Sequence, residues 1–137
     1  MRKYLKRLAL VLCLVLAFCT SVSAMAQNEV SVTIYTVDPS KDSNTMVCYG
    51  TVKLEGCNSI YSDRNLSVQL RQKTSTSSYT TLSSTSLPVG TGWMAETWYL
   101  ILNNYSIPSG SELYVHLEPV GGTSGCFGGG RLTKLQN

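Results

Sequence analysis

The segment Asn65-Leu-Ser-Val-Gln-Leu-Arg-Gln-Lys73 has the clearest periodic pattern in this chain. Leu66, Val68 and Leu70 occupy every second position, and polar residues occupy the positions between them. Side chains alternate between the two faces of an extended strand, so this pattern predicts a strand with one buried face and one solvated face. Such a strand needs a second layer of structure to cover its apolar face.

Similar alternation on both sides of this segment predicts further strands, and polar or Pro/Gly-containing turns separate them. No segment after residue 26 has apolar residues at helical spacing over a useful length. We therefore predict an all-β fold, a single antiparallel β-sandwich of the immunoglobulin-like kind with about seven strands, and an open β-barrel is the alternative. The other predicted strands span residues 30–37, 46–54, 78–87, 93–102, 113–118 and 131–135.

Three connecting regions allow more than one interpretation. Eleven of the thirteen residues in 74–86 are Ser or Thr. This composition fits a disordered stalk, or a hairpin with a polar turn at 74–77 and an edge strand at 78–87. We favour the hairpin. Residues 56–64 are predicted to be a long connection. Residues 121–130 contain six glycines and are predicted to be the least ordered part of the domain.

The first 26 residues have the features of a secretory signal. Four basic residues lie within the first seven positions, residues 8–19 are an unbroken apolar run, and Ala24-Met25-Ala26 offers small residues for cleavage before Gln27. The apolar run is shorter than the roughly 20 residues of a membrane-spanning helix. We therefore expect a secreted, extracellular domain at 27–137 with no stable membrane span once the signal is cleaved.

Cleavage of the signal changes the charge balance. The whole chain has 11 basic and 8 acidic residues, and the signal contains 4 of the basic ones, which leaves 7 − 8 = −1 for the secreted domain. A domain without excess positive charge has no electrostatic attraction for a phosphate backbone, so nucleic-acid binding is not expected.

Three cysteines remain after cleavage, namely Cys48, Cys57 and Cys126. Export to an oxidising compartment favours one disulfide among them, and the spacing leaves all three pairings open. The alternative is that all three are buried thiols. A zinc site is not expected, because the chain has no Cys-x-x-Cys pair and His116 is its only histidine.

Two segments resemble a known class of module. Leu66–Lys73 with the Ser/Thr-rich hairpin behind it, and Tyr105-Ser-Ile-Pro-Ser-Gly-Ser-Glu-Leu-Tyr-Val-His-Leu117, are similar to consecutive strands of immunoglobulin-like or fibronectin-type-III-like modules of bacterial secreted proteins. The resemblance covers about half of the secreted domain and departs from antibody domains in lacking their Cys, Trp, Cys order. It implies a sandwich fold and no particular ligand or site residue.

Catalytic signals are sparse. The chain has no Gly-x-Ser-x-Gly elbow and no loop of alternating Asp and Asn for calcium. The alternation in 113–118 predicts that His116 is an exposed strand residue, opposite the apolar face. We expect neither catalytic residues nor metal or cofactor ligands, and we predict that the protein is not an enzyme.

Aromatic residues are the remaining functional signal, because the secreted domain has more Tyr and Trp than a core of this size needs. Exposed rings can anchor a protein partner or stack on a sugar, although ordinary cross-strand packing also uses them. The first hypothesis is a non-catalytic interaction or adhesion module for an unknown protein or cell-surface partner. The alternative is a carbohydrate-binding module that uses Trp93, Tyr99 and Tyr114, which would require three or more coplanar rings on one solvent-exposed face.

Overall fold

The computed structural model describes residues 28–93, 97–108 and 110–135. The predicted signal at 1–26 lies outside these residues. Within them all regular structure is β, and no helix is long and apolar enough to cross a membrane. The strands are β1 (Glu29–Ile34), β2 (Lys41–Asp42), β3 (Met46–Cys48), β4 (Thr51–Asn58), β5 (Leu66–Lys73), β6 (Tyr79–Leu87), β7 (Tyr99–Ser106), β8 (Ser111–Pro119) and β9 (Gly128–Leu135).

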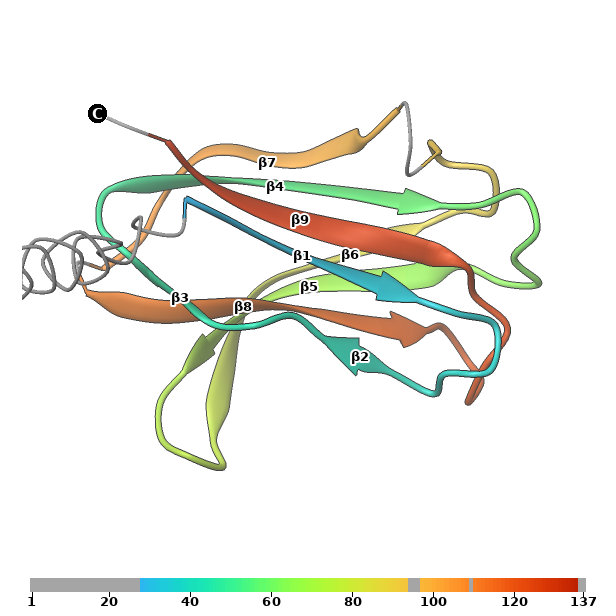
Figure 1. Ribbon diagram of the computed structural model, residues 1–137, viewed down its shortest axis with the longest axis horizontal. Coiled ribbons are helices and arrows are strands. Elements are labelled where there is room, and N and C mark those ends of the chain that lie inside the picture. Colours follow the sequence, from blue (N-terminus) through green and yellow to red (C-terminus); the bar gives the residue numbers. More distant parts are fainter. Residues whose placement is uncertain (1–27, 94–96, 109, 136–137) are drawn as a thin grey trace, which may run out of the picture.

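The strands form two antiparallel sheets that lie one above the other (Figure 1). Sheet A has the strand order β1-β9-β4-β7, and sheet B has the order β2-β8-β5-β6 with β3 also paired to β8. The predicted all-β, two-layered arrangement is confirmed. The sheets are not closed into a barrel, and the described residues form nine strands rather than about seven because two short strands, β2 and β3, share the edge of β8.

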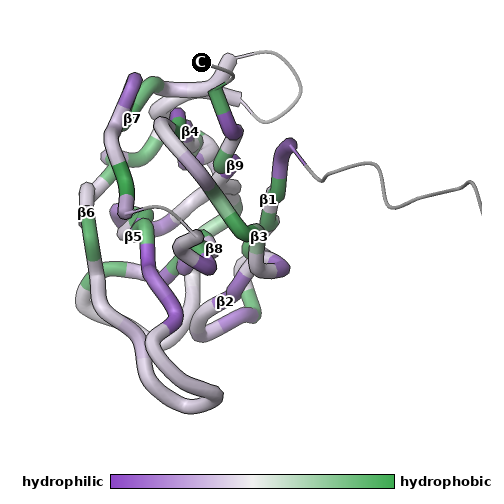
Figure 2. Tube along the Cα trace, turned by 90° about the vertical axis from the view of Figure 1, so that its left-hand side faces the viewer, coloured by the Kyte–Doolittle hydropathy of each residue, from purple (hydrophilic) through white to green (hydrophobic). Residues whose placement is uncertain are grey.

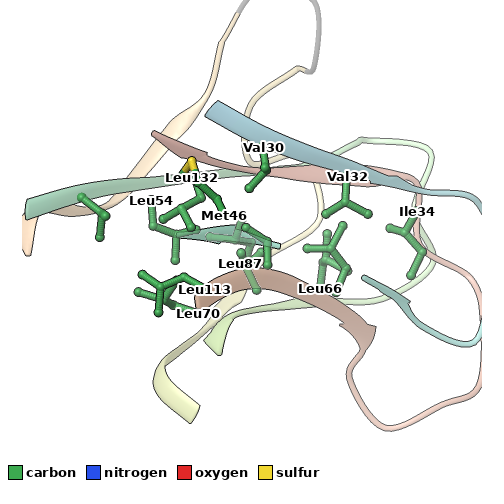
Figure 3. Packing of buried hydrophobic residues seen from close by; sticks show 14 of the residues in the cluster. Val30, Val32, Ile34, Met46, Leu54, Leu66, Leu70, Leu87, Leu113 and Leu132 are labelled. Carbon is green, nitrogen blue, oxygen red and sulfur yellow. The ribbon is translucent and has the colours of Figure 1, made fainter. Parts of the chain in front are cut away.

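The apolar core lies between the two sheets, where the alternation predicted it (Figure 3). Leu66, Val68 and Leu70 of β5 are fully buried, and so are the three alternating apolar residues of β8. They meet Val30, Val32 and Ile34 of β1, which come from the opposite sheet. Period-2 alternation therefore identified the inner faces of both layers.

The strand predicted at 46–54 is in fact two strands in different sheets. Gly50 has a φ of 86°, a left-handed conformation that an L-residue rarely adopts and that ends β3. The chain then passes from sheet B, where β3 pairs with β8, to sheet A, where β4 pairs with β7 and β9. Because β4 continues to Asn58, the connection predicted at 56–64 begins only at Ser59.

The strand predicted at 93–102 also lies later in the chain than expected. β7 begins at Tyr99 and continues to Ser106, four residues beyond the predicted end at 102. It is an edge strand of sheet A and is mostly exposed. Residues 94–96 of the predicted strand lie outside the described residues.

The Ser/Thr-rich segment forms the predicted hairpin. β5 and β6 pair antiparallel from Leu66↔Leu87 to Lys73↔Tyr79, and β6 is the edge strand of sheet B. The end-on view shows the hairpin projecting beyond the two layers, in the pale colours of residues that are neither strongly hydrophilic nor strongly hydrophobic (Figure 2). The stalk interpretation of this segment was wrong.

The last part of the glycine-rich tail is regular structure, because Gly128–Gly130 begin β9, an inner strand of sheet A. Gly130 is the register partner of Gly56 on β4. A Cβ atom on Gly130 would lie 2.6 Å from Val115 Cγ1 of sheet B, and one on Gly128 would lie 2.8 Å from Leu66 Cδ2. The missing side chains let sheet B approach closely, so glycine here serves packing and not flexibility.

Candidate functional site

The three residues predicted for ligand binding come from different elements. Trp93 lies in the connection between β6 and β7, Tyr99 is the first residue of β7 in sheet A, and Tyr114 lies on β8 of sheet B. Trp93 packs against Tyr61 with ring centroids 6.1 Å apart and planes at 70°, and Tyr114 packs against Tyr79 at 6.5 Å and 84°. Trp93 and Tyr114 therefore take part in two separate edge-to-face pairs.

An apolar surface lies instead at one end of the molecule, where two connections meet. We define the loop-end patch as Ile60 and Tyr61, from the β4–β5 connection, with Val89 and Trp93, from the β6–β7 connection. Their exposed fractions are 66%, 67%, 42% and 39% in that order. Exposed apolar side chains that gather at one place on a protein surface are candidates for an interaction site.

Asn58, the last residue of β4, holds the two connections together beneath this patch. It is fully buried, and its side-chain amide donates hydrogen bonds of 3.0 Å to the carbonyl oxygens of Arg64 and Leu87. Its backbone N–H donates to the carbonyl oxygen of Thr91 at 2.8 Å. Both loops are therefore fixed to the same strand end, and the patch is part of a braced structure.

A second aromatic pair extends the apolar surface at this end. Tyr35, which follows β1, lies 5.8 Å from Phe127, which precedes β9. The Ser62 hydroxyl accepts a hydrogen bond from the Phe127 N–H at 2.8 Å, and the Ser59 N–H donates to the Phe127 carbonyl at 2.8 Å. These bonds connect the second pair to the β4–β5 connection that contains half of the loop-end patch.

The predicted disulfide is not formed, because Cys48, Cys57 and Cys126 are all free, buried thiols. Cys48 and Cys126 belong to the core, whereas Cys57 lies on the other face of β4, where a Cβ on Gly92 would be 3.3 Å from it. Burial raises the pKa of all three thiols, that of Cys57 to about 11. Buried thiols with raised pKa values are poorly reactive, and these three act as small buried residues.

His116 was predicted to be exposed, but only 8% of it is accessible. The short strand β2 lies beside it, and His116 Nδ1 is 2.6 Å from Asp42 Oδ1, while Nε2 is 3.7 Å from Glu118 Oε2. In the described part of the chain no hydroxyl group is hydrogen-bonded to His116, and no cluster of His, Cys, Asp and Glu could hold a metal ion. Its contacts are those of a residue that fixes β2 to β8.

Comparisons with known protein families, with curated proteins and with solved structures found no match. Family membership therefore supplies no ligand, partner or catalytic residue for this chain. The loop-end patch is the site that the geometry of the chain itself supports best.

Proposed function

We propose that this protein is a secreted, non-catalytic interaction or adhesion module that binds a protein partner, free or on a cell surface, through the loop-end patch. The observation that supports the proposal is the contact between the exposed rings of Tyr61 and Trp93, which come from two connections that share one brace at Asn58 and also expose Ile60 and Val89. Aromatic residues of this kind are the usual anchors of protein interfaces.

The patch is large enough to contribute usefully to binding. Tyr and Trp side chains bury about 150–250 Å² each, so the exposed fractions of Tyr61 and Trp93 leave roughly 200 Å² for a partner to cover. At about 25 cal/mol per Å² this corresponds to about 5 kcal/mol before the costs of association are subtracted. The hydrogen bonds from Asn58 reduce one of those costs, since they hold Arg64 and Leu87 in place before a partner binds.

The ring geometry favours a protein partner over the carbohydrate alternative. The Tyr61 and Trp93 rings meet edge to face at 70°, so they do not present two parallel faces to a sugar. A T-shaped pair instead presents one ring edge and one ring face, an uneven surface that suits the irregular surface of a protein. Tyr99 and Tyr114 lie elsewhere and add no further ring to this pair.

The immunoglobulin-like resemblance remains part of the proposal at the level of architecture, supported by the two antiparallel layers around one core. One difference concerns the last strand. In immunoglobulin domains it lies beside its predecessor, whereas β9 lies between β1 and β4 in the opposite sheet from β8.

A surface-binding assay tests the proposed function. The protein is expressed with its own N-terminal segment, purified, labelled and applied to cells and extracellular matrix from its natural surroundings. We expect saturable binding that is lost in the double variant Tyr61→Ser/Trp93→Ser. The matched control is Val47→Ser/Tyr49→Ser, which removes two exposed apolar side chains from β3 and the residue that follows it, outside the patch.

Two results would count against this function. Equal binding by the patch variant and the native protein would show that the patch is not the contact surface. Binding that disappears after enzymatic removal of surface glycans, and that free sugar inhibits, would favour the carbohydrate alternative.

A further inference from the structure

A cleft of about 310 Å³ opens beside the projecting hairpin, on the side of sheet B that faces away from the core. One wall is the hairpin tip at Ser75–Ser78, and the other comes from residues at β2 and the segment after it. Arg71 of β5 and Tyr114 of β8 are register partners and lie between these walls. The cleft is therefore built from four strands and is separate from the loop-end patch.

Arg71 is the notable residue of the cleft, because it is a cation with only 9% of its surface exposed. Its Nε donates a 2.9 Å hydrogen bond to Gln69 Oε1, and Gln69 Nε2 donates in turn to the Ser67 hydroxyl at 3.1 Å. Its guanidinium lies 3.9 Å over the ring of Tyr79, whose edge meets Tyr114. The orientation of the guanidinium plane is thus fixed by a hydrogen bond and by a ring.

The terminal Nη1 and Nη2 atoms of Arg71 have no hydrogen-bond acceptor within the described chain, and no described carboxylate forms an ion pair with them. The contrast with Arg131 is informative, since that arginine also lies over a ring, Trp98, yet pairs with Glu55 at 2.8 Å. Buried charges in proteins are normally paired. A pre-oriented guanidinium with two free amino groups matches a carboxylate, which accepts two parallel hydrogen bonds.

The rest of the cleft is rich in hydroxyl groups, and its one carboxylate, that of Asp42, contacts His116 Nδ1 at 2.6 Å. Ser75, Thr76, Ser77 and Ser78 follow one another along the hairpin tip, and the Ser77 N–H donates to the Ser75 hydroxyl, which shapes the turn. Lys73 is the other cation, but it already pairs with Glu112 at 3.4 Å. A phosphate or sulfate would draw on more than one unpaired cation, whereas a carboxylate that is surrounded by hydroxyl groups needs one.

We propose that this cleft binds an acidic monosaccharide unit, with its carboxylate on Arg71 and its hydroxyl groups on the hairpin tip. A volume of about 310 Å³ lies at the lower end of the range for small-ligand sites, which suits a single sugar ring. Tyr79 and Tyr114 supply ring edges and hydroxyl groups for the same ligand, and no flat stacking platform is needed. The site is independent of the proposed protein contact at the loop-end patch.

The test is an NMR titration of the ¹⁵N-labelled protein with glucuronate. We expect saturable shifts in the amides of Ser75–Tyr79 and in the Nε resonance of Arg71, with none at Tyr61. Glucose, which lacks only the carboxylate, should produce no saturable shift. Arg71→Lys should weaken glucuronate binding about 10-fold or more, because it keeps the charge and loses the paired donors.

Matched variants test whether binding depends on Arg71 itself. Arg131→Lys alters the other ring-stacked arginine and should leave the glucuronate affinity within about two-fold. Should Arg71→Lys fail to fold, a change in the Arg71 Nε resonance of the native protein on addition of glucuronate shows that Arg71 takes part in binding. The Tyr61→Ser/Trp93→Ser protein should bind glucuronate normally, so failure of the cleft proposal and failure of the proposed function are distinguishable.

Three outcomes would overturn the proposal. The first is the absence of saturable shifts with glucuronate. The second is an equal response to glucose, which would remove the role of the carboxylate. The third is equally tight binding of a short acetylated peptide with a free C-terminal carboxylate, which would assign the site to peptides instead of acidic sugars.

Discussion

Replacement of Gly130 by alanine tests the close approach of the two sheets. The added Cβ would lie 2.6 Å from Val115 Cγ1 and 3.2 Å from Leu117 Cδ2. Valine is branched at Cβ and cannot swing its methyl group away without leaving its preferred rotamer. The substitution therefore forces either the side chain or the sheet to move.

The expected cost follows from two opposing effects. Overpacking of a filled core destabilises by about 1–3 kcal/mol. Gly→Ala also restricts the unfolded chain, which offsets about 0.4–1 kcal/mol of that cost. We predict that Gly130→Ala lowers the free energy of unfolding by about 1–2 kcal/mol and the melting temperature by about 5 °C or more.

Urea unfolding of a double-mutant cycle with Val115→Ala measures this effect directly. In the Val115→Ala background the new Cβ occupies vacated space, so Gly130→Ala should become neutral or stabilising, with a coupling of about 1 kcal/mol or more. Gly56→Ala is a graded comparison and should cost less than Gly130→Ala, because its closest contact is the flexible end of Leu87 at 2.9 Å. A neutral Gly130→Ala, or a cost that is unchanged by Val115→Ala, would refute the packing argument.

Three further changes have predictable effects on stability. Burial raises the pKa of Cys57 from 9.0 to about 11, so the unfolded state loses the thiol proton at a lower pH than the folded state does. The free energy of unfolding should therefore fall as the pH rises from about 9 to 11, by roughly 2–3 kcal/mol at most. Urea unfolding at pH 7 and pH 10.5 should show a smaller fall for Cys57→Ala than for the native protein, and equal falls would contradict the assignment. Glu55→Ala removes the ion pair with Arg131 and leaves a partly buried cation, so chemical unfolding should show a loss of about 2 kcal/mol; no loss would mean that the pair is not formed in solution. Asp42→Ala removes the 2.6 Å contact with His116, and thermal unfolding should show that the free energy of unfolding falls by about 1 kcal/mol. An unchanged unfolding midpoint would mean that this contact does not hold β2 against β8.

The sequence predicted the parts of the fold in which one residue pattern decides the structure. The strands β5 and β8 follow from strict alternation of apolar and polar residues, and their apolar faces are buried as predicted. The β5–β6 hairpin was favoured for a different reason, the preference of the branched Thr side chain for strands. The break at Gly50 was missed because alternation continues through it: Cys48 and Val52 are both buried, although they belong to different sheets.

The glycine-rich start of β9 could not be predicted, because the need for glycine there comes from side chains of the opposite sheet. Glycine lowers strand propensity, and only the approach of Val115 to Gly130 explains why β9 needs it. His116 was misjudged for a similar reason. Alternation placed it correctly on the face opposite the core, but the burial of that residue depends on β2, a strand of only two residues.

The candidate site was predicted only in part. Trp93 was singled out as an exposed aromatic residue, but its partner Tyr61 and the brace at Asn58 are brought to it by folding, across about 30 residues of sequence. Nothing in the local pattern around Asn58 distinguishes it from a turn residue. Arg71 was seen as one polar position of a half-exposed strand, and its unpaired guanidinium becomes evident only when Tyr79 and the hairpin tip lie around it.

Oxidative footprinting of the surface-bound protein is the most direct test of the proposed interaction. Hydroxyl radicals modify exposed aromatic side chains, and peptide mass spectrometry reports the modification of each residue in the free and the bound protein. We predict that binding protects Tyr61 and Trp93 strongly and leaves Tyr49, which is 64% exposed and lies outside the patch, unchanged. Full modification of Tyr61 and Trp93 in the bound protein would contradict the assignment of the loop-end patch as the contact surface.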